Sequence, residues 1–214
     1  MQLDTHTMAQ SQHNTQPHKQ GLLFVLSAPS GTGKDTVIKT LKEWGTDFHV
    51  VASVTTRAPR PGESTGNPYY FVTEAQFQQM VEQNELLEYA QVHGNWYGQP
   101  LQQIKENVQS GRDVLLKIDV QGAATVRQKL PGAIFIFLVP GSISELVERL
   151  GQRSTETAEE QQRRLADAQG ELAQRDYYDY VIENRQGHLE DAVDALRAIM
   201  RAEHCRTHPR YVTI

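Results

Sequence analysis

The stretch SAPSGTGKDT, Ser27 to Thr36, combines glycines, a lysine and small polar residues at a spacing that suits bound phosphate. It follows the phosphate-loop pattern G-x-x-x-x-G-K-[ST] except at two positions. Gly31 and Gly33 allow backbone N–H groups to converge on phosphate oxygens, and Lys34 supplies a positive charge. The stretch therefore predicts a site for a nucleoside triphosphate. Its contacts are expected from Ala28, Pro29, Ser30, Gly31, Thr32, Gly33, Lys34, Asp35 and Thr36.

The two departures from this pattern differ in how much they should change the binding of phosphate and metal. Ala28 replaces the first glycine, and a small residue there keeps the loop tight. Asp35 replaces the hydroxyl residue that usually ligates Mg²⁺ in such loops. Because a carboxylate is also a hard oxygen ligand for Mg²⁺, Asp35 is a candidate metal ligand, although it adds a negative charge beside the triphosphate.

A second group of residues suits a phosphate monoester. Arg57 and Arg60 lie three residues apart around a proline, within the stretch SVTTRAPRPGE. Two guanidinium groups can bind a dianionic phosphate through paired hydrogen bonds, so the pair is typical of a phosphate site. Two solvated arginines would give the same pattern, and the pair alone does not decide between these interpretations.

The elements that must position these groups follow from the spacing of apolar residues. Apolar runs bounded by turn residues predict buried strands at Leu22–Ser27, Val114–Ile118, Ile134–Val139 and Tyr180–Ile182. Helical spacing predicts helices at Asp35–Trp44, Leu101–Ser110, Gln121–Leu130, Ser142–Gln152 and Leu189–Cys205. The alternation predicts an α/β fold, with a mostly parallel sheet covered by helices on both faces. Ligands of such a sheet lie at the carboxyl ends of its strands.

Two segments interrupt this alternation. Residues 53–100 are rich in Pro, Gly, Tyr and polar residues, with short strand-like pieces at Tyr69–Val72 and Leu86–Val92. They indicate a small α/β lobe inserted into the connectivity of the sheet. Residues 149–170 are highly charged and lack a strong apolar stripe, which is typical of a solvated, mobile helical flap.

The composition excludes several classes of protein. The chain has 214 residues, 38% hydrophobic and 22% charged, which suits one compact soluble domain with inserted lobes. Its formal net charge of −5 argues against a nucleic-acid or membrane-surface binder. Cys205 is the single cysteine, so no internal disulfide can form and a reducing cytoplasm is expected. Residues 1–20 are polar, which predicts a disordered tail and neither a signal peptide nor a membrane anchor.

Further stretches follow at set distances and strengthen these signals. They are YYF at Tyr69–Phe71, LLEYA at Leu86–Ala90, HGNWYG at His93–Gly98 and IDVQGA at Ile118–Ala123. Together with the phosphate loop and TTRAPRPGE, they make the chain clearly resemble guanylate kinase over nearly everything but the tail. Any one of these stretches would be weak, but their combination is highly specific.

The resemblance implies a function and assigns site residues by position. Guanylate kinase transfers the γ-phosphate of ATP to GMP, and also to dGMP, with Mg²⁺, in purine nucleotide metabolism. The GMP-phosphate contacts fall on Arg57, Arg60, Tyr69 and Tyr97, and the guanine contacts on Ser53, Glu88 and Asp119. The phosphate-clamping arginines of a lid fall on Arg149, Arg153 and Arg164, which join Lys34 and Arg57 as the catalytic set. Asn184 falls beside the base of ATP.

The resemblance also divides the chain. It implies a tail at 1–20, a core formed by 21–52, 101–148 and 171–214, a GMP-binding lobe at 53–100 and a lid at 149–170. Arg163 and Arg175 are interpreted as solvated charges. The expected partners are the small molecules ATP and GMP, with neither nucleic acid nor membrane, and the oligomeric state stays open.

The chemistry of guanine agrees with these assignments. Guanine presents N1–H and N2–H₂ donors on one edge, whereas adenine has an acceptor at N1 and lacks the N2 amine. Glu88 and Asp119 would therefore face adenine with unpaired charge, which is a large penalty. The attacking phosphate oxygen is already anionic, so no general base is nominated. Catalysis is expected from positioning and charge stabilisation, with lid and lobe closing to exclude water.

Three positions depart from the common pattern of that family. They are Asp35, Lys117, where an aspartate is usual, and Gln99, where a Ser or Thr usually helps to read guanine. Gln99 offers both a donor and an acceptor, so it is expected to contact guanine in an altered way. Because the strand ending near Lys117 should neighbour the first strand, we expect Asp35 either to pair with Lys117 or to join the Mg²⁺ shell.

Two other functions compete with guanylate kinase activity. A ribose 1,5-bisphosphate kinase has a similar phosphate loop but lacks the TTRAPRPGE and IDVQG stretches. A non-catalytic guanylate-kinase-like binding module typically loses the loop lysine and glycines, whereas this chain keeps Gly31, Gly33 and Lys34. Both alternatives therefore rank below guanylate kinase activity.

Overall fold

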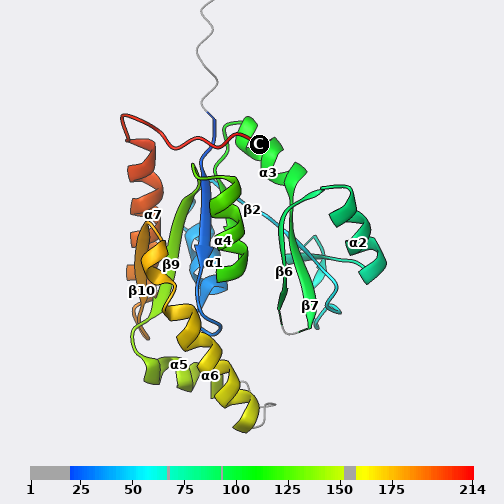
Figure 1. The fold of residues 1–214 in the computed structure, drawn as a ribbon. Helices are drawn as coiled ribbons and strands as arrows, with labels where there is room; N and C mark the ends of the chain where they lie inside the picture. Colours follow the sequence, from blue (N-terminus) through cyan, green and yellow to red (C-terminus); the bar gives the residue numbers. More distant parts are fainter. Residues whose placement is uncertain (1–19, 67, 93, 152–157) are drawn as a thin grey trace, which may run out of the picture.

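The chain folds around a central sheet, with a smaller lobe on one side and a pair of helices beyond one end (Figure 1). The computed structural model describes residues 20–66, 68–92, 94–151 and 158–214. The predicted disordered tail therefore lies outside the described residues, apart from residue 20. Within the described ranges, no helix is both long enough and apolar enough to cross a membrane.

The central sheet has five strands in the order β10-β9-β1-β8-β2, and all neighbours run parallel. The strands are β1 (Leu23–Ser27), β2 (His49–Val50), β8 (Val114–Lys117), β9 (Ile134–Pro140) and β10 (Tyr180–Asn184). The runs LFVLS and IFIFLVP are buried almost throughout, because helices cover both faces of a parallel sheet. This confirms the predicted α/β fold with its parallel sheet, and the predicted strands are present with ends within two residues. The sequence did not reveal β2, which has two residues.

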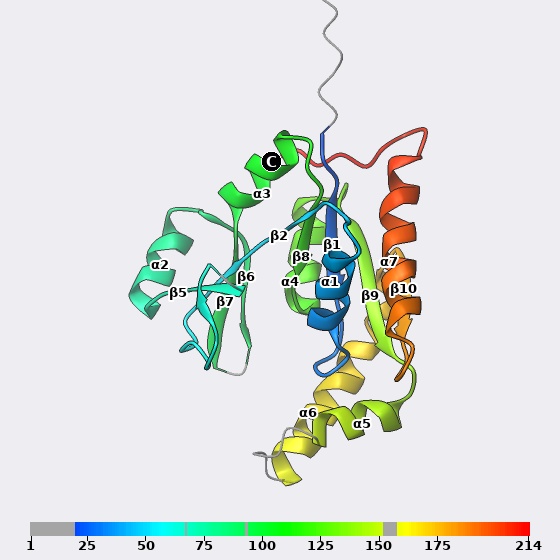
Figure 2. The ribbon, with the colours of Figure 1, turned by 180° about the vertical axis from the view of Figure 1, so that it is seen from behind.

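Four helices cover the two faces of this sheet (Figures 1 and 2). They are α1 (Lys34–Glu43), α3 (Leu101–Gln109), α4 (Val120–Lys129) and α7 (Leu189–His204). Val37 of α1 and Leu196 of α7 belong to one buried cluster. Ile104 of α3 and Val126 of α4 belong to a second buried cluster on the opposite face. The apolar positions spaced at helical period in the sequence are thus the ones that bury against the sheet.

The inserted lobe contains a second five-stranded sheet, in the order β4-β5-β3-β7-β6. Its strands are β3 (Ser53–Thr55), β4 (Ser64–Thr65), β5 (Pro68–Phe71), β6 (Leu86–Val92) and β7 (Asn95–Pro100). β6 and β7 form an antiparallel hairpin, and β7 also pairs with β3. In Figures 1 and 2 this lobe stands beside the central sheet, joined to it near β2 and α3.

Helix α2 (Glu74–Glu82) of the lobe was not predicted individually from the sequence. Among its described residues only Phe77 is buried, so the apolar stripe is too thin to reveal a helix. A capping box does mark its start: the Thr73 hydroxyl accepts from the Gln76 backbone, and the Gln76 side chain accepts from the Thr73 backbone. Thr-x-x-Gln was therefore the signal available in the sequence.

Two helices occupy the connection between β9 and β10. They are α5 (Ile143–Gly151) and α6 (Ala158–Leu172), followed by the short 3-10 helix η1 (Arg175–Tyr177). Leu146 of α5 and Ala168 of α6 are fully buried against each other. Helix α6 thus has a small apolar contact with α5 that the sequence pattern did not reveal, because the two side chains lie on separate helices.

Candidate active site

The loop between β1 and α1 has the backbone shape of an anion site. Gly31 and Gly33 have φ values of 85° and 94°, a left-handed region that side chains disfavour. A Cβ on Gly33 would also lie 2.8 Å from Nδ2 of Asn184. Gly33 precedes α1, and no side chain among the described residues caps the helix. The first N–H groups of α1 are therefore available to an anion.

Lys34 begins α1 and folds back over the loop. Its Nζ donates a 2.5 Å hydrogen bond to the carbonyl oxygen of Ala28. Burial of this ammonium lowers its pKa to about 8, and the nearby carboxylate of Glu171 opposes that effect. An ammonium held in a poorly solvated loop gains most from a bound polyanion, which suits a residue that binds phosphate.

Glu171 of α6 is a member of this site that the sequence reasoning missed. Its carboxylate accepts a hydrogen bond from the backbone N–H of Ser30 and lies near Lys34. Burial raises the pKa of this carboxyl group above its ordinary value. A side chain of α6, one residue beyond the predicted lid, thus contacts the loop that would bind phosphate. Its charged neighbours in the sequence look alike, so no local sequence signal identifies it.

Asp35 and Lys117 form the ion pair that the exchanged charges suggested. Strand β8 pairs with β1 so that Lys117 lies opposite Leu26, just before the loop. Lys117 Nζ donates a 2.5 Å hydrogen bond to Oδ1 of Asp35. The parallel neighbours β1 and β8 therefore bring together two residues that lie far apart in sequence.

The predicted acceptor-phosphate residues lie on β5, on β7 and on the segment that follows β3. Arg57 donates to both carboxylate oxygens of Glu63, at 3.0 and 2.9 Å, and lies 5.4 Å from the ring centre of Tyr69. Tyr97 hydrogen-bonds Arg57, and its ring packs edge-on against Tyr69 at 5.9 Å. The Arg60 backbone N–H donates to Glu63, whereas the residue itself is exposed. Glu63 was not predicted, although it belongs to the TTRAPRPGE stretch.

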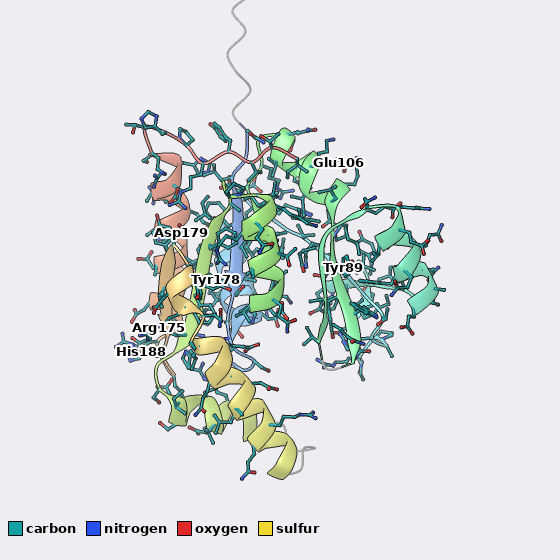
Figure 3. All side chains as sticks on the ribbon, in the orientation of Figure 1. Tyr89, Glu106, Arg175, Tyr178, Asp179 and His188 are labelled. Carbon is teal, nitrogen blue, oxygen red and sulfur yellow. The ribbon has the colours of Figure 1, made fainter. Side chains whose placement is uncertain are left out.

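Glu88 is a buried acid in the lobe, and its whole residue is 3% exposed. Oε2 of its carboxyl group has no hydrogen-bond partner among the described residues. Burial, helped by the charge of Asp119, raises the pKa of Glu88 to about 8. The next residue on β6, Tyr89, which Figure 3 labels, instead packs its ring near Phe77 and Trp96. A buried acid with an unsatisfied oxygen is typical of a site that awaits hydrogen-bond donors.

Three other predicted base-contacting residues surround Glu88 in the lobe and at α4. Gln99 Nε2 donates a 2.7 Å hydrogen bond to Oγ of Ser53, and both residues are buried. Oε1 of Gln99 has no partner among the described residues. Asp119 caps α4, where Oδ1 accepts from the backbone N–H of Gly122 at 2.8 Å. Gln99 is thus held in place through Nε2, while its Oε1 is left to accept a hydrogen bond from a ligand.

One cavity of about 270 Å³ joins the loop and the lobe. Its wall includes Ala28, Ser30, Lys34, Asp35, Ser53, Tyr69, Glu88, Tyr97, Gln99, Lys117, Asp119 and Glu171. A second hollow of about 680 Å³ shares Ser30, Asp119 and Glu171 and extends between α4 and α6. Four predicted site residues are not part of the wall of the first cavity, namely Arg57, Arg60, Arg149 and Asn184. The cavity therefore unites the phosphate loop with the candidate base-reading residues.

The predicted lid arginines are only partly described. Arg149 of α5 donates to the backbone carbonyls of Thr32 and Asn184, at 3.3 and 3.2 Å. The buried side chain of Asn184 donates to the same Thr32 carbonyl at 2.7 Å. Arg153 lies outside the described residues, and of Arg164 only the backbone, within α6, is described. Arg163 and Arg175 are exposed, and Figure 3 labels Arg175.

Comparison with known proteins identifies the family. A model of the guanylate kinase family matches residues 20–203. The chain belongs to the guanylate kinase family. The guanylate kinase of Halalkalibacterium halodurans is 46% identical, covering 88% of this chain and 91% of that protein. The guanylate kinase of Bacillus subtilis is also 46% identical, covering 90% of this chain and 96% of that protein.

A solved guanylate kinase also matches the fold. The crystal structure of guanylate kinase from Anaplasma phagocytophilum is 35% identical, with a TM-score of 0.73. The match covers 88% of this chain and 89% of that one. The parallel sheet, the inserted lobe and the paired helices of this guanylate kinase family member therefore belong to a fold that the family shares.

Proposed function

We propose that the protein transfers the γ-phosphate of ATP to GMP, giving ADP and GDP, and that it also accepts dGMP. The observation that carries this proposal is the single cavity whose wall contains both Lys34 of the phosphate loop and the buried Glu88 of the lobe. A donor loop and a base-reading acid in one cavity suit transfer between two nucleotides better than binding of either alone.

In this proposal the lobe selects guanine. Glu88 carries an unpartnered carboxyl oxygen in a buried position, and the N1–H and N2–H₂ donors of guanine would satisfy it. Asp119, Ser53 and Gln99 contribute further polar atoms to the same wall. Adenine would leave these groups unpaired in a poorly solvated site, which disfavours AMP as the acceptor.

The acceptor phosphate would be held by Arg57, Arg60, Tyr69 and Tyr97. Arg57 is already oriented by Glu63 and by the ring of Tyr69, so it binds phosphate without first losing much conformational freedom. Arg60 is exposed and turns toward the phosphate when the lobe closes on its ligand.

The donor phosphates would lie on the loop from Ala28 to Thr36, with Lys34 at the β- and γ-phosphates and Asn184 toward the base. The described residues contain no cluster of three or more His, Cys, Asp or Glu side chains that could hold a metal. Asp35 fits Mg²⁺ that arrives with the nucleotide, because its side chain is 83% exposed beside the loop and Mg²⁺ often uses one carboxylate with substrate phosphates. When bound, Mg²⁺ neutralises charge on the transferring phosphoryl group.

Catalysis by the chain itself would come from positioning and positive charge. The attacking oxygen of GMP is anionic, so no residue needs to remove a proton. Lys34 and the arginines at 149, 153 and 164 stabilise the charge of the transferring group, and Arg57 holds the acceptor in line. The proposed lid, 149–170, and lobe, 53–100, close over a core formed by 21–52, 101–148 and 171–214 and exclude water. A reducing cytoplasm suits this activity.

A steady-state assay with ATP and Mg²⁺ tests the proposal, using GMP, AMP, UMP and ribose 1,5-bisphosphate as separate acceptors. We expect turnover with GMP and a kcat/KM at least about 100-fold lower with AMP and UMP. Activity confined to ribose 1,5-bisphosphate would identify the alternative kinase, and no activity with any acceptor would identify a binding module.

A matched pair of lysine variants controls this assay. Lys34→Met should lower kcat by about 100-fold or more, because the loop loses its charge on the transferring phosphoryl group. Lys39→Met, on the solvated face of α1 with a side chain 77% exposed, should leave kcat unchanged. Equal activity of the two variants would contradict the role of the loop.

A further inference from the structure

Lys117 is the cation of the cavity that the family pattern does not explain. It ends β8, and the pairing of β8 with β1 places it beside the phosphate loop. Its side chain is 14% exposed, whereas that of its partner Asp35 is 83% exposed. Burying an ammonium is unfavourable unless it is paired, while an exposed carboxylate is well solvated by itself. The contact is therefore needed by Lys117 more than by Asp35.

The other side of Lys117 faces the acceptor lobe. Its Nζ lies 5.2 Å from the ring centre of Tyr69, and the Tyr69 hydroxyl also interacts with it. The same ring packs against Tyr97 and lies 5.4 Å from the guanidinium of Arg57. Lys117 and Arg57 thus approach one aromatic ring, so Lys117 belongs to the group of side chains proposed to hold the acceptor phosphate.

The charges on the cavity wall leave a role for this ammonium. Lys34 and Lys117 are the two cations among the described wall residues, and Lys34 belongs to the donor loop. Arg57, which Glu63 orients, and the exposed Arg60 are not among the residues of this wall. A dianionic phosphate at the Tyr69 end of the cavity would therefore meet Lys117.

We propose that the ammonium of Lys117 is a third cationic ligand of the acceptor phosphate, beside Arg57 and Arg60, and that Asp35 holds it in place and competes with that phosphate for it. The inference rests on the proposed function, since it needs GMP as the acceptor. Burial alone would lower the pKa of Lys117, but Tyr69 and Asp35 raise it above the ordinary value, so the side chain is charged at neutral pH. Lys117 then compensates for the acid at position 35 and also binds substrate.

Calorimetric titration without ATP and without divalent metal, in the presence of a chelator, tests this inference directly. GMP and guanosine are titrated into the full chain, because guanosine has the base but lacks the phosphate. For Lys117→Met we expect the Kd of GMP to rise by about tenfold or more, with the Kd of guanosine unchanged within about twofold. Lys117→Arg should keep most of the affinity for GMP, since the positive charge remains.

A second variant, Asp35→Asn, should change the Kd of GMP in the opposite direction, and it keeps the buried ammonium of Lys117. Asp35→Asn takes the competing charge from Lys117, so the Kd of GMP should fall by about threefold or more. This gain should vanish when Asp35→Asn is combined with Lys117→Met. Asp35 is exposed, so this variant is expected to fold even if Lys117→Met does not.

Two control variants remove a lysine and an aspartate that are exposed on the surface, the same residue types as at positions 117 and 35. Lys39→Met removes an exposed lysine of α1 that pairs with Glu43, and Asp47→Asn removes an exposed acid that pairs with Arg112. Both should bind GMP as the unmodified chain does.

The outcomes separate this inference from the proposed function. If the unmodified chain does not bind GMP, the proposed function is wrong and the inference falls with it. If it binds GMP but Lys117→Met weakens GMP and guanosine equally, or weakens neither, only the role of Lys117 is wrong. Asp35→Asn with unchanged or weaker GMP binding would also overturn that role.

Discussion

Gly122 of α4 backs directly onto the carboxyl group of Glu88. A Cβ at position 122 would lie 2.7 Å from Oε2 and 3.1 Å from Oε1 of Glu88. Gly122 also donates its backbone N–H to Asp119, which caps α4. The backbone of Gly122 therefore contacts both acids that are proposed to read guanine, and the absence of a side chain at this position leaves room for Glu88.

Gly122→Ala should damage binding of GMP while preserving the fold. The added methyl group displaces the flexible end of Glu88, whereas alanine favours a helix over glycine by about 1 kcal/mol. We expect the KM for GMP to rise by about tenfold, with the KM for ATP little changed, in steady-state assays. Gly170→Ala in α6 is the matched control, because a Cβ there meets nothing within 4 Å. Equal KM values for GMP in both variants would contradict a positioning role for Gly122.

Glu88→Gln should stabilise the fold at alkaline pH. Burial raises the pKa of Glu88 from 4.5 to about 8, so the folded chain retains a proton that the unfolded chain has released. Between these pH values the stability contributed by protonated Glu88 therefore falls as pH rises. Glutamine does not titrate, so the variant should gain free energy of unfolding relative to the unmodified chain as pH rises from 4.5 to 8. The gain should reach about 3 kcal/mol in denaturant unfolding. A difference in unfolding free energy that stays flat with pH would show that Glu88 does not titrate in this range.

Binding of GMP should release a proton at pH 7. The carboxyl group of Glu88 is largely protonated in the ligand-free chain because its pKa is raised to about 8, whereas guanine donors require the carboxylate. The affinity for GMP should therefore rise with pH up to about 8. Calorimetry in two buffers of different ionisation enthalpy measures the released proton. Glu88→Gln should reduce the difference between the buffers to the small share that the GMP phosphate itself releases, because its second pKa is about 6.

Glu171→Gln should tighten binding of ATP. The carboxylate of Glu171 accepts from the Ser30 N–H and lies near Lys34, so it competes with the triphosphate for the loop. Removing its charge should lower the Kd of Mg-ATP by about three- to tenfold, measured by calorimetry. Glu148→Gln, at an exposed position of α5, is the matched control and should change nothing. Weaker binding by Glu171→Gln would mean that this carboxylate assists the nucleotide.

Local patterns predicted much of the fold. The apolar runs at 22–27 and 134–139, bounded by turn residues, predicted buried strands, and the structure confirms both. The glycine loop between the first strand and α1 follows from residues adjacent in sequence. Helix α2 was missed because a single buried residue gives almost no periodic signal. Helical periodicity needs several buried positions, so the capping box of Thr73 and Gln76 was the signal that the sequence offered for this helix.

The sequence also determined more of the candidate site than periodicity alone allows. The phosphate-loop pattern named Lys34, and the family resemblance named positions 88, 99 and 119. The structure places all four on one cavity wall. The exchange of charge between Asp35 and Lys117 suggested an ion pair, because β1 and β8 were expected to be neighbours.

What only the tertiary structure decided is which groups compete for the same space. Packing of α6 brings Glu171 to the loop, and packing of α4 brings Gly122 against Glu88. The antiparallel approach of β7 to β3 sets Gln99 against Ser53. The amino-acid sequence determines the residue types and their local conformation through short-range sterics and burial. Contacts between distant elements depend on how whole faces pack, and these contacts decide which side chains are buried without a partner and await a ligand.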